Sequence, residues 1–309
     1  MNPLTNKRSE SVVSLGEEKL IAAIRGWLGA ASPRAPFGIG DDCAVLPPCR
    51  GPQLITVDPV IYGRHFDHRI PARAVGAKLL KRNLSDLAAM GGRPIAAVLA
   101  LTLDRRTSVR WLASFYRGLA AAARTYGVSV VGGDVAQADG VVAATLTLLG
   151  EATSDRFLTR RGARLGDHIY VTGNLGNSLR SKHHFRFSPR LREGSWLTRQ
   201  KIVRSMMDVS DGLAKDLHAL TPSALQPALF PTKIPCRRGA DLRAALTDGE
   251  DYELVFTVAK NADCVLFERA WRRAFPRTRL TRAGYFVAKR DLPRGALNLD
   301  DYRGYEHLR

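Results

Sequence analysis

The sequence predicts an α/β protein built from two domains. Its 309 residues are more than one typical domain needs to bury a core. In the first half, apolar runs of strand length alternate with longer helical patterns, and the order strand–helix–strand–helix–strand–strand indicates a mixed sheet. A polar joint near residues 152–156 marks the predicted boundary, with domains over residues 1–152 and 153–309.

The first half supplies most of the regular pattern. Residues 1–14 are polar and are predicted to be disordered or loosely docked, and the apolar spacing after them is that of a helix ending at Gly29. The further elements alternate, and their predicted ranges are a helix over 17–28, a strand over 53–58, a helix from about 72, a strand over 94–103, a helix over 108–126, and strands over 128–131 and 141–149.

The second half is less regular. Residues 180–194 are basic and poor in apolar side chains, and residues 221–239 carry four prolines, which predicts a long loop. Outside these stretches the pattern predicts four elements, namely a strand over 168–172, a helix over 213–220, a strand over 252–258 and a helix over 262–275.

The net charge of +18 has two interpretations. A basic surface can serve nucleic acid, an anionic membrane or phosphate-bearing small molecules. The basic residues are spread along the whole chain and do not interleave with aromatic residues. This distribution favours a general enrichment in arginine over a nucleic-acid-binding face.

Membrane insertion and export are not predicted. The longest apolar run, residues 95–101, is far too short to cross a bilayer, and residues 1–18 lack the apolar core of a signal peptide. The four cysteines form no C-x-x-C pair, which argues against a zinc knuckle and favours a reducing cytoplasm.

The stretch from Asn83 to Gly92 concentrates polar residues at the end of an apolar helix. Asn83, Ser85 and Asp86 stand inside an otherwise apolar run with small residues around them. Burying a carboxylate costs several kcal/mol unless a cation or hydrogen bonds compensate. Asp86 is therefore either a cation ligand or a solvated acid at a helix end closed by Gly91.

Acidic residues recur at glycine- or serine-marked turns although the chain is strongly basic. Each one alone has a structural explanation, because Asp is common in turns and at helix N-caps. If they converge, their mutual repulsion requires divalent cations, and Mg²⁺ combines a few carboxylates with substrate phosphates. The pattern therefore points to phosphoryl chemistry on a metal–nucleotide, with the candidate acids being Asp42, Asp58, Asp86, Asp134, Asp208 and Asp211.

Six segments, taken in order, resemble the motifs of thiamine-monophosphate kinases. They cover the chain from about residue 17 to residue 307, and their order is more specific than any one of them. The segments are Gly38–Ala44, Asp58 with Gly63–Phe66, Asn83–Gly91, Gly132–Asp134, Asp208–Gly212 and Gly249–Leu254. The resemblance extends to the superfamily that contains aminoimidazole ribonucleotide synthetase and selenide, water dikinase.

The resemblance implies a two-domain fold of the aminoimidazole ribonucleotide synthetase type. In that fold the N-terminal mixed sheet builds a barrel with a second copy of the chain, the C-terminal domain is also α/β, and ATP lies between the domains. It further implies a cytoplasmic homodimer that uses ATP and several Mg²⁺ ions to convert thiamine monophosphate into thiamine diphosphate.

The resemblance also implies roles for individual residues. Metal ligands are expected at Asp42, Thr56, Asp58, Asp86, Asp134, Asp208 and Asp211. ATP contacts are expected at Gly133, Asp134, Arg160 and Ser210. Contacts to the thiamine phosphate are expected at His65, Glu250 and Tyr302, the last as an aromatic residue that stacks on the substrate.

The implied reaction needs no general base. The attacking group is a phosphate whose second pKa is about 6, so it is already ionised at pH 7. The difficulty is to bring two polyanions together, and positioning with metal screening accomplishes this. The sequence therefore predicts no catalytic His or Lys base, and His65 is expected to orient the substrate.

Several positions depart from the family pattern. Val57 replaces a usual Thr, Pro59 and Tyr62 are unusual in their loop, and Asp248 stands where Gly is typical. About one helix is missing between Ser178 and residues 187–190, and the stretch 221–239 is short. Most of these changes fall in the second domain, which leaves two alternatives open. One is a superfamily enzyme with another acceptor, and the other is a degenerate basic protein that binds nucleotides or nucleic acid.

Overall fold

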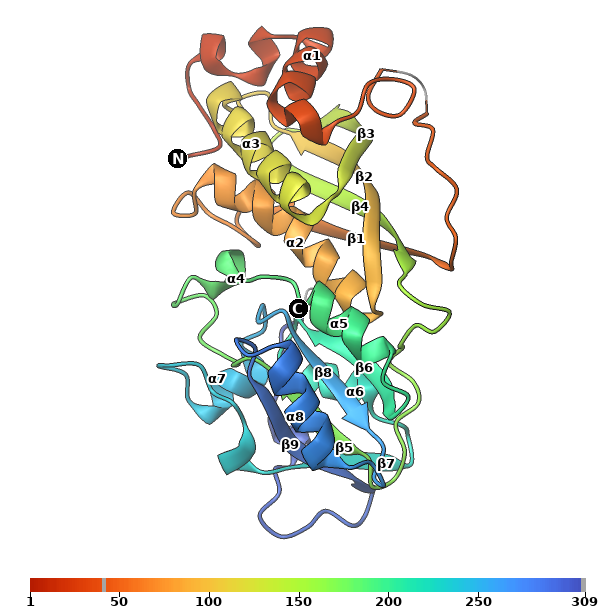
Figure 1. The fold of residues 1–309 in the computed structure, drawn as a ribbon. Helices are drawn as coiled ribbons and strands as arrows, with labels where there is room; N and C mark the ends of the chain where they lie inside the picture. Colours follow the sequence, from red (N-terminus) through yellow and green to blue (C-terminus); the bar gives the residue numbers. More distant parts are fainter. Residues whose placement is uncertain (41–42, 307–309) are drawn as a thin grey trace. The chain divides into compact units, whose positions relative to one another are not determined.

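The computed structural model describes residues 1–40 and 43–306, and the chain divides into two compact units (Figure 1). Unit 1 comprises residues 1–87 and 93–151, and unit 2 comprises residues 88–92 and 152–309. Each unit contains one sheet with helices against it. The assignment of functional domains to residues 1–152 and 153–309 stays a prediction.

Unit 1 is a four-stranded sheet with strand order β1-β4-β2-β3. Its strands are β1 (Gln53–Ile61), β2 (Gly92–Leu103), β3 (Ser129–Gln137) and β4 (Val142–Ala152). Pairing is antiparallel between β1 and β4 and parallel between β2 and β3, so the predicted mixed sheet is confirmed. Pro59 is tolerated in β1 because this strand lies at the edge of the sheet.

In the described part of unit 1 the α-helices are α1 (Glu17–Leu28), α2 (Ala72–Ala89), whose last two residues are assigned to unit 2, and α3 (Val109–Tyr126). Helix α3 begins at the N-cap Ser108, whose hydroxyl accepts the N–H of Trp111, and ends at Gly127 in the left-handed conformation. Its buried face carries Leu112, Phe115 and Leu119 at helical spacing. The helices cover one face of the sheet in Figure 1.

The opposite face of this sheet is apolar and exposed. Alternation along β1 points Thr56 and Asp58 inward and leaves Ile55 and Val57 outward, with exposed fractions of 74% and 58%. Val98 on β2 is 41% exposed as well. These three exposed aliphatic side chains lie on the face away from the helices, on two strands that β4 separates.

The first residues of the chain are docked on unit 1, so of the two predicted alternatives the structure shows docking and not disorder. The N–H groups of Thr5 and Val12 donate to the carbonyl oxygens of Arg106 and Thr107, and Ser108 donates to Pro3. These backbone bonds form around the loop before α3, and sequence periodicity gives no signal for them.

Unit 2 is a five-stranded sheet with strand order β6-β8-β5-β9-β7. Its strands are β5 (His168–Thr172), β6 (Val203–Val209), β7 (Leu225–Leu229), β8 (Glu253–Val258) and β9 (Leu280–Ala288). All six residues of β8 are buried, since β8 lies inside the sheet. The predicted loop over 221–239 contains β7, an edge strand that accepts Pro227.

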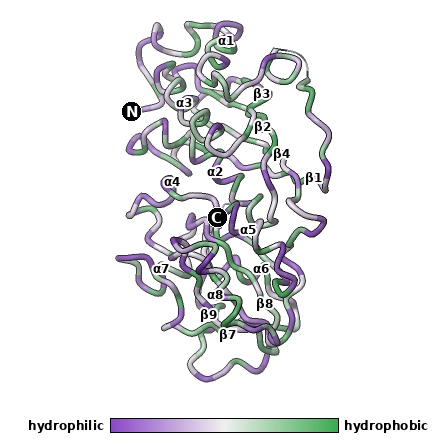
Figure 2. The backbone as a smooth tube through the Cα atoms, in the orientation of Figure 1, coloured by the Kyte–Doolittle hydropathy of each residue, from purple (hydrophilic) through white to green (hydrophobic). Residues whose placement is uncertain are grey.

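Both faces of the second sheet are covered. One core contains Val209, Val255 and Ile169 with the helices α6 (Leu213–Leu220) and α7 (Leu242–Thr247). The other contains Tyr170 and Phe256 with α5 (Leu191–Thr198) and α8 (Cys264–Ala274). The short helix α4 (His183–Arg186) precedes α5. In Figure 2 the hydrophobic colour follows the strands, and the segment beside α7 is hydrophilic.

Candidate active site

A polar ladder joins α2 to β1 in unit 1. The hydroxyl of Thr56 donates to Asp86 Oδ2 at 2.5 Å, and Arg82 Nη2 donates to Asp58 Oδ1 at 3.0 Å. Four residues of helix rise about 6 Å, and two residues of strand rise about 6.6 Å. This match lets two residues on one stripe of the helix meet two residues on one face of the strand. The structure thus brings Thr56, Asp58 and Asp86 together where α2 packs against β1, with Arg82 bound to Asp58.

His65 lies just beyond the end of this ladder. Its Nδ1 accepts the N–H of Ile61 at 3.1 Å, and its carbonyl oxygen accepts a hydrogen bond from Lys78 Nζ at 3.0 Å. Because Nδ1 is an acceptor, the neutral ring carries its proton on Nε2. The backbone therefore fixes the orientation of His65, which suits a residue that orients a substrate.

Gly132, Gly133 and Asp134 lie inside β3, not in a turn after it, so the predicted strand end at Val131 was wrong. Gly133 pairs with Leu99 and Asp134 with Ala100 on β2. A Cβ at Gly133 would overlap the carbonyl oxygen of Leu99, and its φ is 159°. The strand continues through both glycines because the second one permits this close backbone approach.

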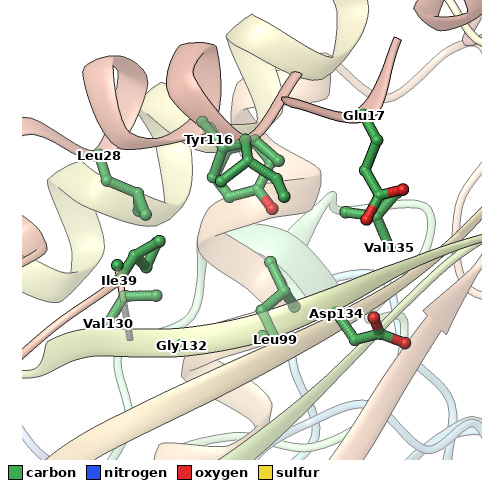
Figure 3. A pocket seen from close by; sticks show the side chains of 13 residues that line it. Glu17, Leu28, Ile39, Leu99, Tyr116, Val130, Gly132, Asp134 and Val135 are labelled. Carbon is green, nitrogen blue, oxygen red and sulfur yellow. The ribbon is translucent and has the colours of Figure 1, made fainter. Parts of the chain in front are cut away.

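A cavity of about 490 Å³ opens beside these glycines (Figure 3). Its walls come from α1, α3, β2 and β3, and most of its lining is apolar, including Ile24, Leu28 and Val130. Among the described lining residues, the carboxylates are Glu17 and Asp134. A cavity of this size with few polar groups is typical of a small-molecule site.

Tyr116 is a lining residue that sequence reasoning missed. It is 3% exposed, burial raises the pKa of its hydroxyl, and its ring stands in the cavity wall in Figure 3. In the sequence it reads as one more apolar position of an amphipathic helix. Only the packing of α1 and α3 over the sheet makes it a pocket residue, as is also true of Glu17.

In unit 2 the Asp208–Gly212 segment runs from the last two residues of β6 to the start of α6. Asp208 is 3% exposed, and the N–H of Glu250 donates to the carbonyl oxygen of Ser210 at 2.7 Å. Lys215 Nζ donates to Asp211 Oδ2 at 2.7 Å, and the N–H of Tyr305 donates to the carbonyl oxygen of Asp211 at 2.9 Å. The structure therefore brings Ser210, Asp211 and Glu250 together, with the C-terminal segment beside them.

Glu250 lies in a turn whose backbone is fixed by the contacts of the next residue. Its φ is 55°, a left-handed conformation that is uncommon for a non-glycine residue. The next residue, Asp251, is fully buried, accepts the N–H of Gly176 and pairs with Arg237 at 3.0 Å. Burial raises the pKa of Asp251 to about 7. Fixed backbone of this kind is common at functional sites.

Two further predicted residues lie in different surroundings. Tyr302 is half-buried against the core that contains Val209, and the guanidinium of Arg243 lies 5.9 Å from its ring centroid. Arg160 is exposed and follows Thr159, whose carbonyl oxygen accepts the N–H of Met206 in β6. Asp42 lies outside the described residues.

Among the described residues, the predicted metal ligands do not form a closed cage of acidic side chains. Asp58 on β1 and Asp134 on β3 lie on strands at opposite edges of the sheet. Apart from residues 41–42 and 307–309, no three His, Cys, Asp or Glu side chains lie close enough to hold an ion. Mg²⁺ is often bound by one or two carboxylates plus substrate phosphates, and oxygen pairs such as Thr56 with Asp86 fit that kind of binding. The full set of seven predicted ligands stays a prediction.

Asp216 holds the Asp208–Gly212 segment through two backbone hydrogen bonds, and its burial makes the stability of the fold depend on pH. Its Oδ2 accepts the N–H groups of Ser210 and Asp211 at 3.0 Å each, and its residue is 5% exposed. Burial raises its pKa from 3.8 to about 7. The folded state therefore holds a proton that the unfolded state loses. The stability from this proton is complete below pH 3.8 and is lost as the pH rises to about 7.

The Asp216→Asn variant is expected to flatten this pH dependence. The carboxamide keeps an acceptor oxygen for both N–H groups and has no proton to lose. We expect the slope of unfolding free energy between pH 4 and 7 to become less negative by at most about 1.4 kcal/mol per pH unit. Urea unfolding at a series of pH values measures it, and parallel profiles for the two proteins would contradict the prediction.

The arrangement of unit 1 defines the class of the protein. Residues 40–152, which include all four strands of its mixed sheet, match the family described as AIR synthase related protein, N-terminal domain. Thiamine-monophosphate kinase of Escherichia coli K12 is 36% identical over 80% of this chain and 83% of that protein. The chain belongs to the thiamine-monophosphate kinase family.

Solved structures agree with this assignment. Thiamine-monophosphate kinase from Stenotrophomonas maltophilia K279a superposes with a TM-score of 0.73 at 30% identity, over 89% of this chain and 95% of that one. AaThiL complexed with AMPPCP and TMP gives a TM-score of 0.70 at 28% identity, over 95% of this chain and 97% of that one. The predicted two-unit α/β fold of this superfamily is therefore confirmed. Within the described ranges, no helix has the length and hydropathy to span a membrane.

Proposed function

We propose that this protein transfers the γ-phosphoryl group of ATP to thiamine monophosphate and forms thiamine diphosphate. The observation that carries the proposal is similarity over nearly the whole chain to kinases with this activity in their name, one of them complexed with AMPPCP and TMP. In the reaction, a phosphate oxygen of thiamine monophosphate bonds to the γ-phosphorus, and the bond from that phosphorus to the β-phosphate oxygen breaks.

The cavity beside β3 supports binding of the nucleotide to unit 1. Gly133 and Asp134 line it, and both were expected to contact ATP. Its apolar walls with Tyr116 suit a nucleoside, and the exposed Asp134 at its edge suits the phosphate side. We therefore assign this cavity to the part of the nucleotide that contacts Gly133 and Asp134, and the ATP contacts expected at Arg160 and Ser210 belong to unit 2.

The remaining residues position charge. Magnesium, when bound, supplies positive charge that screens the two phosphates, and the residues that would hold it are Asp42, Thr56, Asp58, Asp86, Asp134, Asp208 and Asp211. The Thr56 hydroxyl fixes Asp86, and the backbone fixes His65 and Glu250 for the acceptor. Tyr302 would stack on the thiamine, and Arg160 and Ser210 would contact ATP. No residue has to remove a proton, because the acceptor phosphate is already ionised at pH 7.

The direct test is product formation. Purified protein with Mg·ATP and thiamine monophosphate is expected to yield thiamine diphosphate, detected by chromatography after oxidation to a fluorescent thiochrome. No product, under conditions in which the Escherichia coli enzyme makes it, would refute the proposal. ATP consumption with another phosphate acceptor in a substrate screen would refute the proposed acceptor alone.

The four cysteines are free thiols, which supports action in the cytoplasm.

The apolar outer face of the first sheet supports a homodimer. An isologous contact would bury Ile55, Val57 and Val98 of both copies. We expect Ile55→Lys to convert a dimer into a monomer in sedimentation equilibrium, because burying an unpaired ammonium is costly. Val265→Lys is the matched control, since Val265 is 58% exposed on α8 in unit 2. If the Ile55→Lys variant still sediments with the mass of a dimer, this face is not the dimer interface.

A further inference from the structure

Arg82 contacts a candidate metal ligand directly. One guanidinium nitrogen donates to Asp58 Oδ1 at 3.0 Å, and another donates to the carbonyl oxygen of Pro59 at 2.7 Å. The side chains of Arg82 and Asp58 are 10% and 23% exposed. A guanidinium with two acceptors and little solvent has few other positions available, so it holds the Asp58 carboxylate in one orientation.

Arg82 lies on the same face of α2 as the candidate metal ligand Asp86. Lys78, Arg82 and Asp86 follow one another at intervals of four residues, and they meet His65, Asp58 and Thr56 in turn. Along α2, the positive charge of Arg82 thus lies between Lys78, which binds the backbone of His65, and Asp86, which binds Thr56. It neutralises Asp58 without any added ion.

We propose that Arg82 is the resident counter-cation of Asp58, a positioning residue that weakens the binding of divalent ions to the nucleotide-free protein. The inference rests on the proposed function, in which Asp58 is a metal ligand. With Arg82 on one carboxylate oxygen, a metal must compete with the guanidinium and is repelled by it. A metal that arrives with nucleotide phosphates brings its own negative charge, so that repulsion is offset. Arg82 therefore favours binding of the metal–nucleotide complex over binding of the bare ion.

The test measures Mn²⁺ binding to the full-length protein without nucleotide or thiamine phosphate. Free Mn²⁺ is read from its electron paramagnetic resonance signal during a titration. The Arg82→Gln variant removes the charge, and we expect it to bind Mn²⁺ about three- to tenfold more tightly than the unmodified protein, because a unit positive charge a few ångströms from the ion no longer repels it. The Arg82→Lys variant keeps the positive charge that repels the ion, and it is expected to stay within about twofold of the unmodified protein.

The matched control is Arg69→Gln. Arg69 pairs with Asp67 at 2.5 Å in the same unit, but its side chain is 81% exposed and lies outside the ladder. Its Mn²⁺ titration is expected to be unchanged. If Arg82 acted only by stabilising the fold, both Arg82 variants would bind Mn²⁺ as tightly as the unmodified protein or less tightly. Thermal unfolding identifies a variant that has lost its fold.

Three outcomes separate the inference from the proposed function. Tighter Mn²⁺ binding by Arg82→Gln, with normal binding by Arg82→Lys, supports the inference even if no thiamine diphosphate is formed. Unchanged or weaker Mn²⁺ binding by folded Arg82→Gln overturns it, even if the kinase activity is present. An equal gain in affinity for Arg69→Gln also overturns it, since the effect would then reflect net charge alone.

Discussion

Replacing Asp86 with Asn will lower the rate of thiamine diphosphate formation by about 10³-fold, as expected when a group that stabilises transition-state charge is lost. Asp86 is half-buried at the end of α2 and accepts the Thr56 hydroxyl at 2.5 Å. The Asn side chain has the same shape and still accepts that hydrogen bond, but it lacks the negative charge that a cation requires. Turnover at saturating Mg·ATP measures the loss.

Asp67→Asn is the control for this experiment. Asp67 belongs to the same unit and pairs with exposed Arg69, so its neutralisation removes an equal charge from outside the ladder. We expect its turnover to stay within about twofold, because surface ion pairs contribute little. Both variants are expected to unfold at the temperature of the unmodified protein. If Asp86→Asn keeps more than a tenth of the activity, Asp86 is not a ligand of the reacting complex.

The ladder shows which part of the site the sequence could predict. Thr56, Asp58 and Asp86 stand out as polar residues in apolar surroundings. Arg82 does not, because one more arginine in a chain of 47 Lys and Arg residues carries no signal. Its role depends on how the helix is set against the strand, and that register follows from packing between segments some 25 residues apart. Periodicity within each segment cannot determine it.

Glycines and prolines were misread where tertiary contacts override local preference. Gly132 and Gly133 read as a turn, yet β3 continues through them because it pairs with β2 along its whole length. Pro227 reads as a loop residue, yet it lies in the edge strand β7. In both cases the missing information was the strand order. It determines whether a neighbouring strand needs the backbone N–H that proline lacks, and whether a neighbouring backbone leaves room for a Cβ.

The elements of unit 2 that escaped prediction have a similar explanation. Helix α5 lies in a basic stretch, but Leu197 and Trp196 pack against Trp271 and Phe267 of α8. A few large side chains therefore hold a segment whose composition resembles a loop. Helices α6 and α8 were predicted close to their observed limits, because their apolar stripes repeat over at least two turns.

Two glycines set the distance between α2 and α3, and with it the position of the ladder. A Cβ on Gly118 of α3 would overlap the carbonyl oxygen of Arg73 on α2, and a Cβ on Gly76 of α2 would overlap the carbonyl oxygen of Phe115 on α3. The clashing atoms are backbone atoms, so no side-chain rotation relieves them. The helices lie this close because both partners are glycines at the contact.

The Gly118→Ala variant is therefore expected to destabilise the fold by about 3 kcal/mol, at the upper end for overpacking, because α2 or α3 must move as a whole. Gly26→Ala is the control. Gly26 lies inside α1, a Cβ there would meet no atom within 4 Å, and alanine should stabilise the helix by up to about 1 kcal/mol. Urea unfolding measures both changes. A Gly118→Ala protein as stable as Gly26→Ala would show that the helix contact can relax and that it does not fix α2. If the contact does fix α2, folded Gly118→Ala protein should also lose turnover, since Asp86 and Arg82 move with their helix.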